Sequence, residues 1–249
     1  MNLSTAHVLI TGGGRGIGRH LVEQFTRDAQ RVCVFEKDQS AIAELGSTFA
    51  SVSAYQCDVT DAAAVSKSLV QLEADGFKLD VLVNNAGLIY SAPLINLLKK
   101  TDRVHSAEKW REVLETNLSS VFYVTGAVID HMLRHRKKGV IVSMSSISAR
   151  GNSGQSAYSA AKAGVNALTR TWAKELSCFG LRFVSIAPGF INSPSTYASL
   201  NEALLTKLKH QIPLRRLGEI ADVYQSIRFV VENEYVNGTV IEIDGGLTI

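Results

Sequence analysis

The sequence predicts an α/β protein in which seven parallel strands form one doubly wound sheet with helices on both faces. Short apolar runs alternate with longer amphipathic segments along the whole chain, which is typical of repeated βα units. Several short runs are apolar at consecutive positions, as at residues 81–83, and such strands are buried on both faces. Because 46% of the 249 residues are hydrophobic, one large core is possible, and we expect residues 1–249 to form a single domain.

Each strand and helix can be placed from this pattern. Short apolar runs bounded by turn residues predict strands at residues 7–10, 31–35, 53–56, 81–83, 140–144, 183–187 and 240–243. The amphipathic segments predict helices at residues 16–28, 39–49, 62–74, 107–135, 156–179, 202–210 and 220–231. Asp61 precedes the third helix and is expected to be its N-cap, since its carboxylate can accept hydrogen bonds from first-turn amides.

The charge balance argues against nucleic-acid and membrane partners. A net charge of +3 is too small to indicate either surface by electrostatics. The basic run at residues 134–138 is the local exception, and we interpret it as the solvated end of a helix that Gly139 stops. The sequence has neither the start of a secretory signal nor 18 consecutive apolar residues, so we expect a cytoplasmic protein.

The three cysteines do not form a recognisable framework. Cys33, Cys57 and Cys178 are odd in number and have no CxxC or histidine-rich spacing. This arrangement indicates neither disulfides nor a zinc site. We therefore expect buried, reduced thiols and no metal.

The first predicted strand ends in a glycine-rich turn that leads directly into a helix. Glycines permit a tight turn and let the backbone approach a pyrophosphate, whose charge the free amides at the helix start stabilise. A glycine-rich turn without a ligand is the alternative, but the strand and helix context favours a dinucleotide. The expected contacts are Thr11, Gly12, Gly14, Arg15, Gly16, Ile17 and Gly18.

A carboxylate follows the second predicted strand. Glu36 lies eighteen residues after Gly18, and a carboxylate at this place accepts hydrogen bonds from the adenosine ribose and repels a 2′-phosphate. The sequence therefore predicts NAD in preference to NADP. Arg15 and Lys37 leave NADP open, because either side chain could pair with a phosphate.

Tyr158 and Lys162 are four residues apart at the start of the helix predicted at 156–179. This spacing places both side chains on one helix face. A tyrosine hydroxyl has a pKa of about 10, and a nearby ammonium favours the phenolate and brings it into range for proton transfer. The pair can serve as an acid and a base, although a lone pair of this kind is more often a feature of a helix surface.

Seven short motifs follow one another along the chain. They are Thr11-Gly12-(x)3-Gly16-Ile17-Gly18, Cys57-Asp58-Val59, Asn84-Asn85-Ala86-Gly87, Asn117, Ser145, Tyr158-(x)3-Lys162 and Pro188-Gly189. In these motifs and their order the chain resembles the classical short-chain dehydrogenase/reductase family along nearly its whole length, and especially its 3-oxoacyl reductase-like members. The resemblance implies a Rossmann fold and a hydride transfer between a nicotinamide cofactor and a small carbonyl or alcohol substrate.

The resemblance also implies a role for each matching catalytic residue. Tyr158 would be the general acid/base, and Lys162 would lower its pKa and hold the nicotinamide ribose. Ser145 would donate a hydrogen bond to the substrate oxygen, and Asn117 would hold a water that relays protons. Three nearby serines are weaker candidates for the role of Ser145: Ser143, Ser146 and Ser148. Two preset hydroxyl donors suit the negative charge that develops on the oxygen during reduction.

Further cofactor contacts are implied at the ends of other strands. Asp58 and Val59 would contact the adenine, Asn85 the ribose, and the backbone of Ile191 the carboxamide. Ser193 stands where the family often has a threonine. The remaining implied contacts are Ala86, Gly87, Pro188 and Gly189.

Two irregular segments and the assembly state are less defined. Residues 88–109 would wall the substrate pocket, contribute to a subunit contact or form a disordered loop. Residues 190–216 are expected to cover the pocket as a substrate loop, and their basic and apolar side chains suit either an apolar substrate with an anionic handle or an amphipathic helix packed on the domain. Phe179 replaces a basic residue common in carrier-protein reductases, which puts a carrier-bound substrate in doubt.

The resemblance implies a homotetramer or homodimer, with helices 107–135 and 156–179 in one interface and the strand at 240–243 in another. Two other functions stay open. One is a catalytically silent dinucleotide-binding redox sensor, and the other is an epimerase or dehydratase of the same family that recycles its cofactor.

Overall fold

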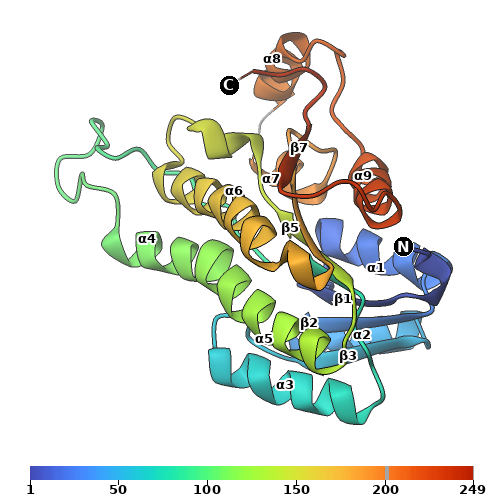
Figure 1. Ribbon diagram of the computed structural model, residues 1–249. Helices are drawn as coiled ribbons and strands as arrows, with labels where there is room; N and C mark the ends of the chain where they lie inside the picture. The colour runs from blue at the N-terminus through green and yellow to red at the C-terminus, as the bar shows by residue number, and fades with distance from the viewer. Residues whose placement is uncertain (200–201, 249) are drawn as a thin grey trace.

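The computed structural model describes residues 1–199 and 202–248, and its centre is one parallel sheet (Figure 1). In the described residues the sheet has seven strands in the order β3-β2-β1-β4-β5-β6-β7. The strands are β1 (His7–Thr11), β2 (Arg31–Glu36), β3 (Val52–Gln56), β4 (Val81–Asn84), β5 (Gly139–Met144), β6 (Leu181–Pro188) and β7 (Thr239–Ile243). The predicted fold class is confirmed, and each strand end lies within two residues of its predicted position.

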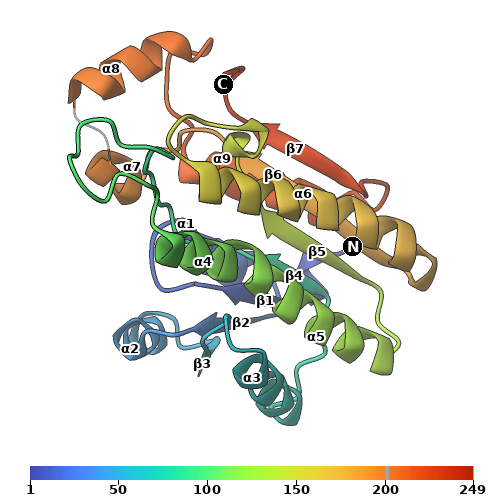
Figure 2. The ribbon, with the colours of Figure 1, turned by 90° about the vertical axis from the view of Figure 1, so that its left-hand side faces the viewer.

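Helices cover both faces of this sheet (Figure 2). One face is covered by α1 (Gly16–Asp28), α2 (Gln39–Thr48) and α9 (Ile220–Glu232), and the other by α3 (Ala62–Ala74), α5 (Ser120–Arg134) and α6 (Ser156–Leu176). Along β5, Val140 and Val142 pack toward the first layer and Ile141 toward the second. Because every position of an inner strand meets a helix layer, consecutive apolar residues are stable there, each contributing about 1.5–3 kcal/mol on burial.

Residues at the helix ends explain where α3 begins and where α6 ends. The Asp61 carboxylate accepts a hydrogen bond from the Ala63 amide at 2.8 Å, which confirms the predicted N-cap of α3. The helix predicted at 156–179 is α6, followed by a 3₁₀ turn at Ser177–Phe179, and Gly180 then adopts the left-handed conformation with φ of 78°.

The helix predicted at 107–135 is interrupted. It consists of α4 (Ala107–Leu114), a π-helical segment (Glu115–Ser119) and α5. The prediction that Gly139 stops it was wrong, because α5 ends at Arg134 and Gly139 already belongs to β5. Arg136 has φ of 50°, so the chain turns out of the helix at this basic residue instead of a glycine.

Cysteine burial was predicted correctly at two of three positions. Cys33 and Cys57 are buried, Cys178 is exposed, and all three are free thiols. The expectation for Cys178 failed because it lies in the 3₁₀ turn after α6, where the chain leaves the core. No helix in the described part of the chain is long and apolar enough to cross a membrane.

The two irregular segments both have local structure. Residues 88–106 contain a short antiparallel bridge between Ile95 and Val104, and the segment extends beyond the N-terminal end of α4 (Figure 1). The substrate-loop segment 190–216 contains α7 (Pro194–Ser199) and α8 (Glu202–Gln211), while its residues 200 and 201 lie outside the described residues. Leu208 of α8 is buried against Ile147, as expected of an amphipathic helix packed on the domain.

Candidate active site

The glycine turn lies where the strand order reverses. β1 pairs with β2 on one side and with β4 on the other, and in sheets of this type the crevice outside the carboxyl ends of such strands is the usual ligand site. The turn follows β1 directly, and Gly12 has φ of 67°. A Cβ at Gly18 would lie 2.0 Å from the Gly12 oxygen, so glycine is required here for close packing of helix on turn.

Thr11 and Asn85 join this turn to the end of β4. The Thr11 hydroxyl oxygen accepts hydrogen bonds from the amides of Asn85 and Ala86, both at 3.0 Å. The Asn85 side-chain amide donates to the carbonyls of Thr11 and Gly12, at 3.0 and 2.9 Å. Asn85 therefore shapes the glycine turn, and its contact with a ribose stays a prediction.

Glu36 ends β2 beside the same turn. One carboxylate oxygen accepts from the Gly14 amide at 3.0 Å, and the other accepts from the amides of Lys37 and Asp38, at 2.9 and 3.2 Å. These bonds hold a negative charge beside the pyrophosphate turn.

The other predicted cofactor residues lie on the same sheet edge, because the carboxyl ends of parallel strands meet there. Asp58 accepts from the amide and hydroxyl of Thr60, and Val59 is buried. Gly189 donates to the Ile243 carbonyl at 2.8 Å at the end of β6. Ile191 and Ser193 are buried. Pro188 is the last residue of β6, and Gly87 lies three residues after the end of β4.

The space around the glycine turn shows whether a dinucleotide can bind there. Apart from the adjacent residues and the backbone of its own helix, no described atom lies within 4 Å of the position that a Cβ would take at Gly16, which has φ of 56°. The turn thus combines open space with the exposed amides of a helix start, the surroundings that a pyrophosphate requires. The residues present fit a dinucleotide cofactor.

Tyr158 and Lys162 lie together in the first turns of α6. The Lys162 ammonium is 5.7 Å from the centre of the Tyr158 ring and donates to the Met144 carbonyl at 2.6 Å. Both side chains are buried, at 9% and 4% exposure. The i, i+4 spacing therefore does bring the predicted acid/base pair to one face, at the end of β5.

Burial sets the protonation of this pair. It raises the pKa of the Tyr158 hydroxyl, and a hydrogen bond with the Ser146 side chain acts in the opposite direction. Burial also lowers the pKa of Lys162, to about 8. The expectation that the ammonium lowers the pKa of the tyrosine is not met in this structure, since burial decides the direction.

The serines in and after β5 have different partners. Ser145 is buried and its hydroxyl donates to the Lys162 carbonyl at 3.3 Å. Ser146 is the serine whose side chain lowers the pKa of Tyr158, and its hydroxyl accepts from the Ser148 amide at 3.1 Å. Ser143 lies deeper, where its hydroxyl accepts from Asn84 at 3.3 Å.

Asn117 lies in the π-helical segment and is 1% exposed. Its side-chain amide donates to the carbonyls of Leu88 and Val113, each at 3.0 Å, and its side-chain oxygen accepts from the Leu88 amide at 3.1 Å. Both amide hydrogens are thus committed. The side chain fixes the segment after β4. It has no amide hydrogen left to donate to the water of the predicted proton relay.

Sequence reasoning missed two groups of the site. The first is the Met144 carbonyl, which no side-chain pattern could reveal as the acceptor for Lys162. The second is Gln155, which accepts from Ser148 and Asn152 and donates to Ser91, at 2.9, 3.1 and 3.1 Å. Gln155 thereby ties the turn before Tyr158 to the segment after β4, and its place three residues before the tyrosine was the available signal.

Several known proteins are similar to this chain over most or all of its length. A family model described as short chain dehydrogenase matches residues 6–203. The 3-oxoacyl-acyl-carrier-protein reductase of Thermotoga maritima is 36% identical over 255 aligned positions, covering 100% of both chains. The protein of that name from Staphylococcus epidermidis is 34% identical, covering 96% of this chain and 97% of its own.

A solved structure from Agrobacterium tumefaciens, provisionally described as a gluconate dehydrogenase, is also similar. It has a TM-score of 0.88 and 27% identity, covering 99% of this chain and 97% of that one. The family match extends over most of the chain and the relatives match it end to end. The chain therefore belongs to the short chain dehydrogenase family and is an oxidoreductase that acts on a CH–OH group or its carbonyl with a nicotinamide cofactor.

Proposed function

We propose that this protein transfers a hydride between NAD and a small carbonyl or alcohol substrate, with Tyr158 as general acid/base. The observation that carries the proposal is the buried Tyr158 and Lys162 pair at the same sheet edge as the glycine turn and Glu36. In this reading residues 1–249 act as one domain and residues 190–216 cover the substrate.

The protein's own residues supply binding and proton transfer. The glycine turn and the start of α1 hold the pyrophosphate, Glu36 holds the adenosine ribose, and the bound nicotinamide supplies or accepts the hydride. Because burial raises the pKa of Tyr158, its hydroxyl is protonated near neutral pH and can donate a proton to a carbonyl oxygen. A serine hydroxyl, from Ser145 or Ser146, adds a second donor to that oxygen.

The first test is a fluorescence titration with NADH and NADPH, followed by a panel of carbonyl and alcohol substrates. The names of the relatives place 3-oxoacyl thioesters and sugar acids in that panel. Turnover with a net change in NADH supports the proposal. Substrate conversion without a net change would indicate an epimerase or dehydratase, and cofactor binding without conversion on the whole panel would favour a redox sensor.

Glu36 is expected to set the cofactor preference. Its negative charge repels a 2′-phosphate, so Glu36→Gln removes the repulsion while keeping an oxygen acceptor for the Gly14 amide. We expect the NADH to NADPH affinity ratio to fall by about tenfold or more, since hydrogen bonds to charged groups are worth about 1.5–3 kcal/mol. Isothermal titration measures both affinities, and an unchanged ratio would contradict the assignment.

We also propose that the protein is a homotetramer. An apolar groove on the outer side of α5 and α6 is lined by Leu118, Phe122 and Leu168, and Phe122 is 56% exposed. A second groove lies between α9 and β7. Exposed apolar surface of this kind marks subunit interfaces.

Phe122→Glu is expected to break the first interface. A charge at the centre of an apolar contact has no partner to offset its desolvation, so the variant should form dimers through the other groove. Size exclusion with light scattering measures the mass of wild type and variant. A wild-type monomer at micromolar concentration would overturn the tetramer, and a tetrameric variant would overturn the placement of this interface.

A further inference from the structure

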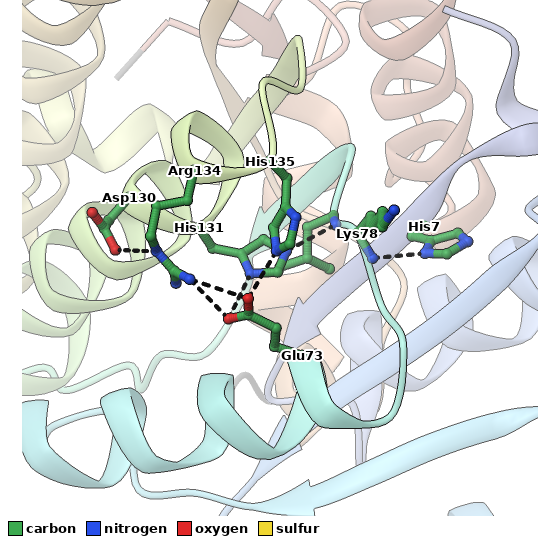
Figure 3. A network of polar contacts seen from close by, with 8 residues as sticks. His7, Glu73, Lys78, Asp130, His131, Arg134 and His135 are labelled. Carbon is green, nitrogen blue, oxygen red and sulfur yellow. Dashed lines mark hydrogen bonds and ion pairs between the residues drawn. The ribbon is translucent and has the colours of Figure 1, made fainter.

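Glu73, His131 and His135 meet at the edge of the sheet opposite the active site. Glu73 lies at the end of α3, while His131 and His135 lie at the end of α5. Leu79, whose amide contacts His131, precedes β4, which places the cluster at the amino ends of the strands. Figure 3 shows the Glu73 carboxylate directed at both imidazole rings and at Arg134.

The three side chains have the spacing of a metal-ligand set. Their ligating atoms lie within 4.8 Å of one another. One Glu73 oxygen is 2.9 Å from His135 Nε2, and the other is 3.7 Å from His131 Nδ1. Ligands at 2.0–2.1 Å around a tetrahedral zinc ion are about 3.3 Å apart. Small rotations of these side chains are therefore sufficient to surround an ion.

His131 supplies the second observation. Its side chain is fully buried and Nδ1 has no hydrogen-bond partner, although it points at the carboxylate. Buried polar atoms are nearly always paired, so an unpaired one calls for a partner.

We propose that Glu73, His131 and His135 bind one divalent transition-metal ion of the zinc type. Two imidazoles and one carboxylate are ligands that Zn²⁺ prefers. The i, i+4 spacing places both histidines on one face of α5. Glu73 and His135 are partly exposed, at 32% and 25%, which provides an entry path and room for water as a fourth ligand. The prediction of no metal rested on the absence of CxxC and histidine-rich spacing around the cysteines, and this proposal departs from it.

Arg134 is the competing cation of this site. Its guanidinium contacts both Glu73 oxygens, at 3.1 and 3.0 Å, and also donates to Asp130 at 2.9 Å. The Arg134 side chain is 52% exposed. An incoming ion takes the carboxylate, and the guanidinium keeps its contact with Asp130. Removing the charge of Arg134 therefore strengthens ion binding.

Metal binding also changes the proton on His131. Nε2 accepts from the Leu79 amide at 3.3 Å, so without metal the neutral ring carries its proton on Nδ1. When an ion binds Nδ1, that proton moves to Nε2. Nε2 then no longer accepts the hydrogen bond from the Leu79 amide. This bond is long, so its loss weakens binding without preventing it. The bound ion then cross-links α3 and α5 at a distance from the active site and stabilises the fold.

The test is a titration of untagged, metal-free protein with Zn²⁺ and, separately, Co²⁺, following bound metal by equilibrium dialysis and stability by thermal unfolding. We expect one ion per chain and a Tm increase of about 5 °C or more at a hundredfold excess over Kd. Glu73→Gln and His135→Ala should each weaken Zn²⁺ binding by about tenfold or more. Arg134→Gln should tighten it.

A matched control removes a histidine elsewhere. His210→Ala, in α8, should bind Zn²⁺ as wild type does. Equal affinity of wild type and His135→Ala would overturn the proposal, as would loss of binding in His210→Ala or weaker binding in Arg134→Gln. All variants change exposed or partly exposed side chains, so each is expected to fold, and circular dichroism checks this.

Discussion

Tyr158→Phe is expected to reduce turnover by about 10²–10⁴-fold, the usual contribution of a positioned acid or base. The substitution removes only the hydroxyl that we propose as the proton donor. The ring stays in the pocket formed with Val113 and Ala157. NADH affinity should change little, because the glycine turn and Glu36 are untouched. Steady-state rates on the best panel substrate and a fluorescence titration measure the two effects separately.

A second tyrosine provides the control for this experiment. Tyr235 is fully exposed in the turn between α9 and β7, so Tyr235→Phe should keep wild-type turnover. The Tyr158→Phe variant removes one hydroxyl and leaves the packed ring in place, so it should remain folded. Retention of comparable turnover by folded Tyr158→Phe would show that another group transfers the proton.

Gly18→Ala is expected to abolish tight cofactor binding, the other large effect. The new Cβ would lie 2.0 Å from the Gly12 oxygen and 2.5 Å from the Asn85 side-chain nitrogen. The turn must shift to admit it, and the pyrophosphate site moves with the turn. We expect a loss of NADH affinity of at least about tenfold and a destabilisation of about 1–3 kcal/mol from overpacking. Isothermal titration and urea unfolding measure the two changes.

The same substitution in an open place is the control. Gly46 lies in α2, and apart from the adjacent residues and the backbone of that helix no described atom lies within 4 Å of the position that a Cβ would take. Gly46→Ala should therefore keep NADH affinity and stabilise the helix by up to about 1 kcal/mol. If Gly18→Ala bound NADH like Gly46→Ala, the glycine turn would not be the pyrophosphate site.

The sequence by itself determined the sheet and the place of the site. Residues 81–83 of the inner strand β4 are apolar at consecutive positions because they are buried on both sides, and this pattern needs no knowledge of distant contacts. The glycine turn and the Tyr158 and Lys162 pair are likewise local, since their geometry depends on residues a few positions apart.

Only the tertiary structure decided how these groups are partnered. That Asn85 holds the glycine turn, that Lys162 donates to a main-chain carbonyl, and that Ser146 contacts Tyr158 all depend on segments brought together by the sheet. The direction of the Tyr158 pKa depended on burial, which the local pattern of charges does not contain. Glu73 and His131 are far apart in the sequence, and the packing of α3 on α5 is the physical reason that they face each other.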